Sequence, residues 1–157
     1  MLGGAAAALA GCTRIPRYDG PAVTRVRVIK SERRLDLLHE GEVLRSYPID
    51  LGFAPDGPKR FEGDGRTPEG SYVIDAKNPD SRYHLSLRIS YPSPEDVARA
   101  RAAGREPGGD IFIHGRGSIL NALKGRDWTA GCIAVGNREI EEIYAMVPEG
   151  TPIDILP

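Results

Sequence analysis

The chain has few of the residues that cross-link small domains or bind metal ions. Its 157 residues include only two cysteines, Cys12 and Cys132, and three histidines, His39, His84 and His114. A disulfide framework or a zinc site needs more sulfur than this unless histidines assist, and these histidines lie far apart in the sequence. The sequence therefore predicts no metal site and no cofactor.

An excess of one charge and long apolar segments are lacking as well. Lys and Arg number 21 against 22 Asp and Glu, which gives a formal charge of −1. The chain therefore has no basic field that would attract nucleic acid. No stretch after the N-terminal run approaches the roughly 18 apolar residues of a transmembrane helix. We expect no nucleic-acid partner and no further membrane-spanning segment.

Glycine and proline, in contrast, are abundant, at 19 and 13 residues. This composition favours a turn-rich β protein over a helical bundle. The length suits one domain and is short for two. We therefore predict a single domain over residues 23–157 that is mainly β with a few short helices.

Local patterns place the expected elements. Apolar-rich runs predict strands at residues 23–29, 33–39, 42–50, 71–76, 85–91, 111–114, 132–135 and 152–156. Cap residues and apolar spacing predict helices at 94–104 after Ser93, in a turn or two of 118–125, and from Asn137, as the cap, to Pro148. Residues 51–70 are rich in Gly, Pro and Asp, and we expect them to form a long loop.

The N-terminal run MLGGAAAALAGC ends in Leu9-Ala10-Gly11-Cys12, which resembles the lipobox of bacterial lipoproteins. The resemblance implies a signal in residues 1–12, a lipid on Cys12, a tether over 13–22 and a periplasmic site in the cell envelope. The run lacks Lys and Arg and is shorter than usual export signals, which is consistent with a truncated leader. The alternative is a disordered Ala/Gly tail. Labelling with a fatty-acid probe, and its loss in Cys12→Ser, distinguishes the two.

The region that carries chemistry runs from His114 to Cys132. Three small residues, Thr129-Ala130-Gly131, precede Cys132 and leave room for a substrate carbonyl. A tight turn there aims backbone N–H groups at a developing oxyanion. An imidazole within reach takes the thiol proton. From the residues alone, the pair is either catalytic or a buried cysteine with an unrelated surface histidine.

At these residues the chain resembles the L,D-transpeptidase catalytic domain, the YkuD-like family, over residues 23–157. The matching motifs are Ile113-His114-Gly115, the eighteen positions from His114 to Cys132, Thr129-x-Gly131-Cys132, Thr67-Pro68-Glu69-Gly70 and Gly150-Thr151-Pro152-Ile153-Asp154-Ile155. The resemblance implies an L,D-transpeptidase-type β-sandwich and an enzyme that acts on peptidoglycan stem peptides.

The resemblance also implies roles. Cys132 attacks the carbonyl on the L-centre of an L,D peptide bond, and a thioester forms. An amine then takes the acyl group, which is transpeptidation. His114 is the base and later the acid, and the Gly115 carbonyl orients its ring. Backbone N–H groups of Gly131 and Cys132 form the oxyanion hole.

Two positions depart from the family pattern. Ala130 stands where many members have histidine, and Ala134 stands where many have an arginine that helps hold a substrate carboxylate. Arg88 and Arg116 are the candidates to replace that arginine, and the alternative for each is an ordinary solvated guanidinium. Thr129 is expected to bind substrate or to bond within its own loop.

The segments 81–87 and 90–92 are similar to the YafK-like branch, which includes hydrolases of peptidoglycan–protein links. An L,D-amidase or carboxypeptidase is therefore the alternative to a transpeptidase. A non-catalytic peptidoglycan-binding lipoprotein is the alternative from another class. A papain-type protease has the opposite order of cysteine and histidine.

Four other residues have side chains that could take part in chemistry or binding, but we expect simpler roles for most of them. His84 is expected at a structural or rim position, and Trp128 in the core or as a wall of the site. Asp64 and Glu69 lie in the Gly/Pro loop, and we expect both carboxylates to be solvated.

Overall fold

The computed structural model describes residues 15–157, so the expected signal and Cys12 lie outside the described residues. The strands are β1 (Arg25–Ile29), β2 (Arg34–His39), β3 (Glu42–Pro48), β4 (Gly70–Ser81), β5 (His84–Ile89), β6 (Phe112–His114), β7 (Ile133–Ala134) and β8 (Pro152–Leu156). The helices are α1 (Pro94–Ala102), α2 (Ile119–Ala122) and α3 (Asn137–Met146). Within residues 15–157 no helix has the length and apolar character needed to cross a membrane.

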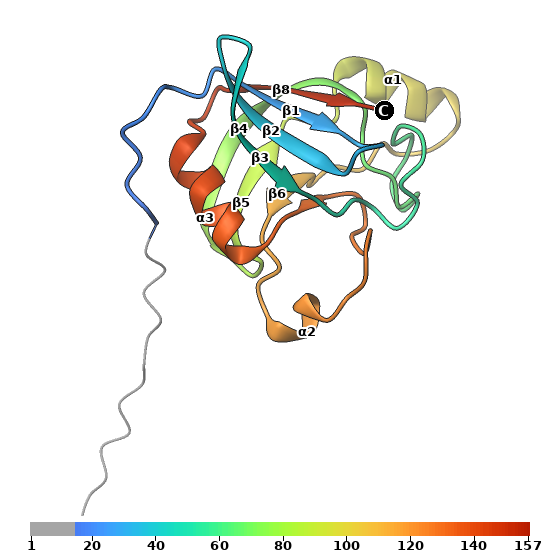
Figure 1. Cartoon of the computed structure of the whole chain (residues 1–157). Helices are drawn as coiled ribbons and strands as arrows, with labels where there is room; N and C mark the ends of the chain where they lie inside the picture. Colours follow the sequence, from blue (N-terminus) through green and yellow to red (C-terminus); the bar gives the residue numbers. More distant parts are fainter. Residues whose placement is uncertain (1–14) are drawn as a thin grey trace, which may run out of the picture.

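The strands form one eight-stranded sheet in the order β3-β2-β1-β8-β4-β5-β6-β7. β4 belongs to both halves, since Gly70–Val73 pair with β8 and Ile74–Ser81 pair with β5. The sheet folds over along β4, so that β1, β2 and β8 face β5 and β6 (Figure 1). This confirms the expectation of a single, mainly β domain with a sandwich architecture and short helices.

The segment after β3, at one edge of the sheet, pairs with β7, the strand at the other edge. Asp50, just after β3, exchanges two backbone hydrogen bonds with Ala134, at 2.8 and 2.9 Å. The edge of β7 is therefore covered, which protects it from pairing with another chain. This closure also brings the start of the 51–69 loop against the segment that leads into Cys132.

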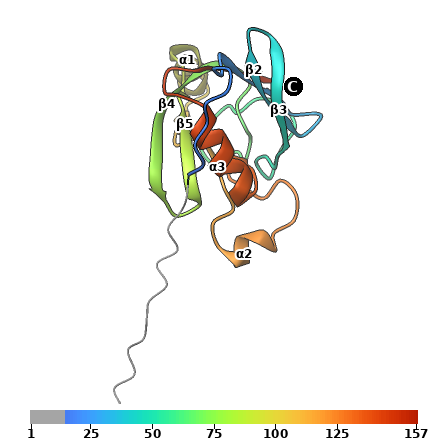
Figure 2. The same ribbon diagram turned by 60° about the vertical axis from the view of Figure 1, so that its left-hand side comes forward.

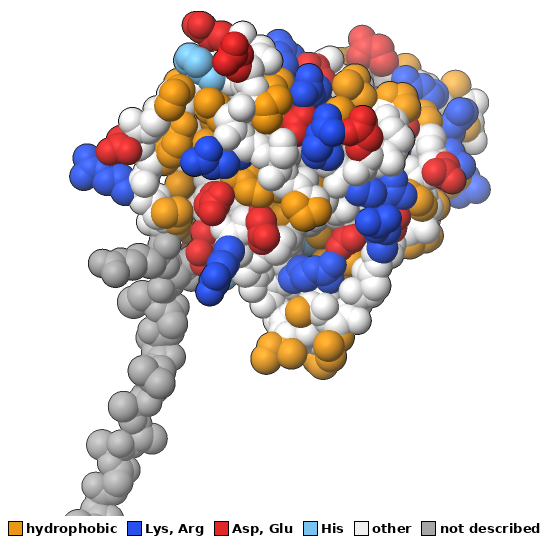
Figure 3. Space-filling model, viewed as in Figure 1, with side chains coloured by type: hydrophobic (Ala, Val, Ile, Leu, Met, Phe, Trp, Pro, Cys, Tyr) orange, Lys and Arg blue, Asp and Glu red, His pale blue; other side chains and the backbone are white. Residues whose placement is uncertain are grey.

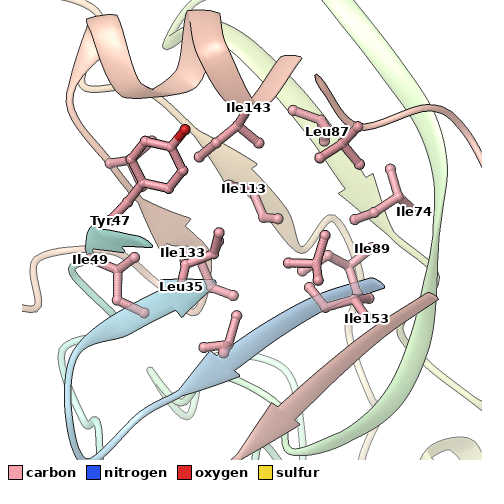
Figure 4. Close-up of a cluster of buried hydrophobic side chains, with 14 of the residues drawn as sticks. Leu35, Tyr47, Ile49, Ile74, Leu87, Ile89, Ile113, Ile133, Ile143 and Ile153 are labelled. Atoms are coloured by element: carbon pink, nitrogen blue, oxygen red, sulfur yellow. The ribbon is translucent and has the colours of Figure 1, made fainter. Parts of the chain in front are cut away.

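The core lies between the two layers and under α3. Alternate residues of β1 and β8 are buried, as side chains that point inward at every second position require, whereas β2 and β5 are buried over most of their length. Figure 4 shows Leu35 and Ile153 from one layer approaching Ile74 and Leu87 from the other. All four are fully buried, and each such side chain contributes about 1.5–3 kcal/mol through its removal from water.

The helices agree with the predicted positions but differ at their ends. Ser93 caps α1 through a reciprocal bond with Asp96, as its sequence predicts, and α1 ends at Ala102. The cap of α3 is Gly136, so the prediction that Asn137 caps it is wrong. The Asn137 side chain instead bonds to both backbone groups of Gly117.

The short helix α2 stands on a loop that protrudes from the body of the molecule. Ser118 caps it, and its apolar side chains Ile119 and Leu120 are exposed. Figure 3 shows hydrophobic side chains gathered at this tip.

The strand predicted at 71–76 extends to Ser81, because pairing with β5 holds a polar segment that has little strand propensity of its own. Pro79 lies where the ladder is irregular, between Asn78 and Ser81, so its missing N–H breaks no regular pairing. The resulting long hairpin reaches down beside α3 in Figure 2. Residues at the tip of this hairpin line a cleft.

The 51–69 loop has no helix or strand, as predicted, but its carboxylates are not solvated. The Asp64 side chain is only 6% exposed and pairs with Lys59 at 3.0 Å. It also accepts backbone N–H groups of Arg60, Phe61 and Arg66. Burial raises the pKa of Asp64, but these donors outweigh it and hold the pKa below its ordinary value.

Glu69 is likewise withdrawn from water, at 17% exposure, and pairs with the buried Lys30 at 2.9 Å. Lys30 Nζ also donates to the carbonyls of Gly57 and Thr67. The expectation that Asp64 and Glu69 are solvated is therefore wrong, because backbone groups of a loop without secondary structure need internal partners.

Candidate active site

Two adjacent parallel strands place His114 and Cys132 on the same face of the sheet. β6 and β7 pair in register, with Ile113 opposite Ile133 and His114 opposite Ala134. Paired residues share a face, and side chains alternate along each strand. Cys132, two positions before Ala134, therefore points to the side on which His114 lies.

Both side chains open into one cleft with a volume of about 700 Å³. Its lining comprises Asn78, Asp80, Ser81, Arg82, Tyr83, Ser86, Asp110, Phe112, His114, Lys124, Trp128, Thr129, Ala130 and Cys132. These residues come from the β4–β5 hairpin, from β6 and from the segment before β7. The volume is in the range of sites that bind small molecules and short peptides.

The ring of His114 is fixed on three sides. Its Nδ1 lies 2.6 Å from the carbonyl oxygen of Gly115. Tyr83 stacks on the ring at 4.3 Å between centroids, and Trp128 meets it edge-on at 5.8 Å. A carbonyl only accepts, so Nδ1 carries the hydrogen and the neutral ring keeps an unprotonated Nε2.

The pKa of His114 is lowered from its ordinary value. Burial is the main cause, and the positive charge of Arg82 adds to it, whereas the Gly115 carbonyl partly opposes both. His114 is therefore neutral near pH 7. A neutral imidazole with a free Nε2 is able to take a proton.

The thiol of Cys132 is partly exposed to the cleft. Its sulfur lies 3.4 Å from the carbonyl oxygen of Asp110, to which the S–H donates. Burial raises the pKa of Cys132, and the negative charge of Asp110 raises it further. The sulfur is therefore a thiol at neutral pH, and it needs a base before it can attack a carbonyl.

A small hydrogen-bonded turn holds the segment that leads into Cys132. Thr129 Oγ1 donates to the Cys132 carbonyl at 2.7 Å and accepts the Gly131 N–H at 3.1 Å. Gly131 has a φ of +141°, and a Cβ there would lie 2.8 Å from the Arg66 carbonyl oxygen. Only glycine fits this position without strain.

This turn bears on two expectations. Thr129 bonds within its own loop, and its one O–H donor is used there, so the structure does not support the expected contact with substrate. The Gly131 N–H already has Thr129 as its acceptor, which leaves the Cys132 N–H as the other expected donor to an oxyanion.

The two arginines expected to hold a substrate carboxylate do not line the cleft. Arg88 is exposed and pairs with Asp75 at 2.8 Å. Arg116 pairs with Asp50 and donates to the Asn121 carbonyl at 2.8 Å, which secures the α2 loop. Neither candidate arginine therefore lines the cleft into which Cys132 opens.

The other two histidines have structural partners. His84 Nε2 lies 2.7 Å from Glu141, so it ties the hairpin to α3, as its expected structural position requires. His39 is bonded to the Ala22 carbonyl at 2.7 Å. Among residues 15–157, no three His, Cys, Asp or Glu side chains come together in a way that could hold a metal ion.

Sequence reasoning missed several residues of the cleft. Tyr83 and Arg82 lie at the tip of the β4–β5 hairpin, and no local pattern indicates that this tip folds over His114. Lys124 lies in the α2 loop and reaches the ring of Trp128 at 4.7 Å. Trp128 lines the cleft, which agrees with one of the two positions expected for it.

Comparison with known proteins identifies the family of this domain. A family model described as the L,D-transpeptidase catalytic domain (YkuD) matches residues 23–155. Over 128 residues the chain is 34% identical to YafK of Escherichia coli K12, whose name assigns it to the L,D-transpeptidases, with 78% of this chain and 46% of YafK covered.

Solved structures are similar as well. The helical cell shape determining protein Pgp2 of Campylobacter jejuni matches with a TM-score of 0.66 and 26% identity, over 88% of this chain and 49% of that one. Bd1075 of Bdellovibrio bacteriovorus shares the fold, with a TM-score of 0.62 and 23% identity, over 86% of this chain and 48% of that one. The chain spans about half the length of these relatives.

Proposed function

The chain belongs to the L,D-transpeptidase catalytic-domain family, and from that premise we propose that it modifies peptidoglycan stem peptides as a transpeptidase through an acyl-enzyme on Cys132. The observation that carries the proposal is the common cleft of His114 and Cys132. Nucleophilic catalysis by cysteine needs a thiol and a base that can reach it, and the cleft presents Cys132 together with a buried neutral imidazole whose Nε2 is free.

In the first half-reaction His114 Nε2 takes the thiol proton as the sulfur attacks the carbonyl carbon on the L-centre. The carbonyl oxygen becomes an oxyanion, for which the Cys132 N–H is the first donor. The Gly131 N–H becomes a second donor if it exchanges Thr129 for the oxyanion. The tetrahedral intermediate then expels the amine, which receives its proton from His114.

The second half-reaction resolves the thioester. His114 Nε2, neutral again, takes a proton from the incoming nucleophile, which attacks the acyl carbon and releases the thiolate. An amine nucleophile forms a new peptide bond, whereas water gives hydrolysis. The two outcomes use the same residues, and only the acceptor differs.

The activity should depend on pH through His114. The protonated ring cannot act as a base, and its pKa is lowered from the ordinary value of 6.5, so the acid limb of kcat/KM should have its midpoint below 6.5. The raised pKa of Cys132 keeps the thiol protonated through neutral pH. We therefore expect a flat profile from neutral pH to mildly alkaline pH, measured with a tetrapeptide stem. A midpoint above 7 would contradict the assignment of His114 as the base.

Mass spectrometry of the products distinguishes transfer to an amine from hydrolysis by water. The full chain is incubated with tetrapeptide muropeptides, with and without an added amine acceptor such as a D-amino acid. A transpeptidase yields the exchanged product in proportion to the acceptor. Formation of only the hydrolysed tripeptide, with the acceptor present in excess, would reject transpeptidation and favour the L,D-carboxypeptidase alternative.

We propose a location in the cell envelope, because that is where peptidoglycan stem peptides occur. A lipid on Cys12 remains a proposal that rests on the lipobox-like sequence. No cofactor and no nucleic acid enter the proposed reaction.

A further inference from the structure

Two cations on the wall of the cleft have no acidic partner. Arg82 and Lys124 both line it, and no ion pair among residues 15–157 includes either side chain. The cleft also contains Asp80 and Asp110, yet neither carboxylate pairs with them. The N–H donors of both cations are therefore available to a ligand in the cleft.

Aromatic rings hold these cations beside His114. The guanidinium carbon of Arg82 lies 5.2 Å from the ring centroid of Tyr83, and Lys124 Nζ lies 4.7 Å from that of Trp128. The same two rings flank the imidazole of His114. A cation–π contact restrains a long side chain without using its N–H groups.

We infer that Arg82 and Lys124 form a binding subsite for a carboxylate group of the peptide substrate, an inference that rests on the proposed function. A guanidinium binds a carboxylate through two parallel hydrogen bonds, and an ammonium adds a point charge. Aromatic surfaces behind both cations displace water, which strengthens the attraction.

Asp110 limits how close to Cys132 this carboxylate can lie. Asp110 adjoins Cys132, since its carbonyl oxygen is 3.4 Å from the sulfur. Its own carboxylate repels a negative group at that end. The substrate carboxylate therefore lies toward the Tyr83 and Trp128 rings, on the His114 side of the reacting carbonyl.

A stem peptide offers two such groups near the scissile bond. One is the terminal carboxylate of the departing residue, and the other is the side-chain carboxylate of diaminopimelate at the third position. Both groups are carboxylates. A peptide in which one of them is amidated lacks that negative charge and keeps the other.

The test measures affinity by titration calorimetry in the Cys132→Ala background, where turnover does not interfere. The probe is a tetrapeptide stem with diaminopimelate, compared with its terminal amide and its side-chain amide. Arg82→Gln and Lys124→Gln should each weaken binding of the free acid about fivefold, as expected for exposed charge-assisted bonds. The amide that lacks the bound carboxylate should bind more weakly than the free acid by a similar factor, and neither substitution should weaken its binding further. The amide that behaves in this way shows which of the two carboxylates is bound.

Arg105→Gln is the matched control. Arg105 lies 4.5 Å over the ring of Phe61 but does not line the cleft, so its loss should leave affinity unchanged. Unchanged affinity in Arg82→Gln and Lys124→Gln, or an equal loss for the acid and both amides, would overturn the subsite. Carboxylate-dependent binding by a parent protein that shows no turnover would instead retain the subsite and reject the proposed function.

Discussion

Replacing Cys132 with alanine is expected to lower turnover of tetrapeptide stems by at least about a thousandfold, as removal of a nucleophile does in other acyl-transfer enzymes. The sulfur of Cys132 is the atom to which the acyl group is joined in the proposed reaction, so without it no thioester forms. The fold should persist, because alanine removes only the 3.4 Å contact of the sulfur with the Asp110 carbonyl. Product formation by liquid chromatography and thermal melting measure the two effects.

Three comparisons make this result specific. Cys12→Ser should keep full activity, since it replaces the other cysteine of the chain and none of the residues that line the cleft. Intact-mass analysis should find the muropeptide adduct on the parent protein and none on Cys132→Ala. Turnover of Cys132→Ala at the parental rate would refute the nucleophile, and a parent protein that binds stem peptides but forms neither adduct nor product would favour the non-catalytic binding protein.

The features that follow from local sequence could be predicted. Short apolar runs give the inward faces of β1, β2 and β5, and Ser93 with Pro94 gives the start of α1. These signals depend only on neighbours along the chain. The residues alone leave His114 and Cys132 open between a catalytic pair and a structural one, and it is the resemblance to the L,D-transpeptidase family that favours the catalytic interpretation.

The far wall of the cleft depends on contacts that no local pattern encodes. The polar segment from Ala76 to Ser81 becomes strand only because β5 pairs with it. That pairing carries Tyr83 onto His114, and with it the cation Arg82. Arg116 is the opposite case, a candidate for the cleft that the structure places elsewhere. Its partner Asp50 is distant in sequence, and the ion pair between them secures the α2 loop.

Lys30→Met should destabilise the protein by about 3–5 kcal/mol, the usual cost of removing one partner of a buried ion pair. Lys30 is 3% exposed and Glu69 17% exposed, so the remaining carboxylate has little water to replace the lost ammonium. The carbonyls of Gly57 and Thr67 lose a donor as well. Urea unfolding followed by circular dichroism measures the change.

The substitution also tests how the loop supports the cleft. Lys30 secures the backbone of Thr67, whose Oγ1 accepts the Gly52 N–H at 3.0 Å, and Gly52 bridges to Thr129 beside the candidate nucleophile. Arg25→Met, which breaks an exposed pair with Asp154, is the control and should change stability by no more than about 1 kcal/mol.

A double-mutant cycle isolates the pair itself. Adding Glu69→Gln to Lys30→Met removes the uncompensated charge, so the double variant should be more stable than Lys30→Met alone. If Lys30→Met costs no more than the Arg25→Met control, the buried network does not hold the loop. The position of Thr129 and Cys132 would then have to depend on the hydrogen bonds of their own turn and on the bridge between Asp50 and Ala134.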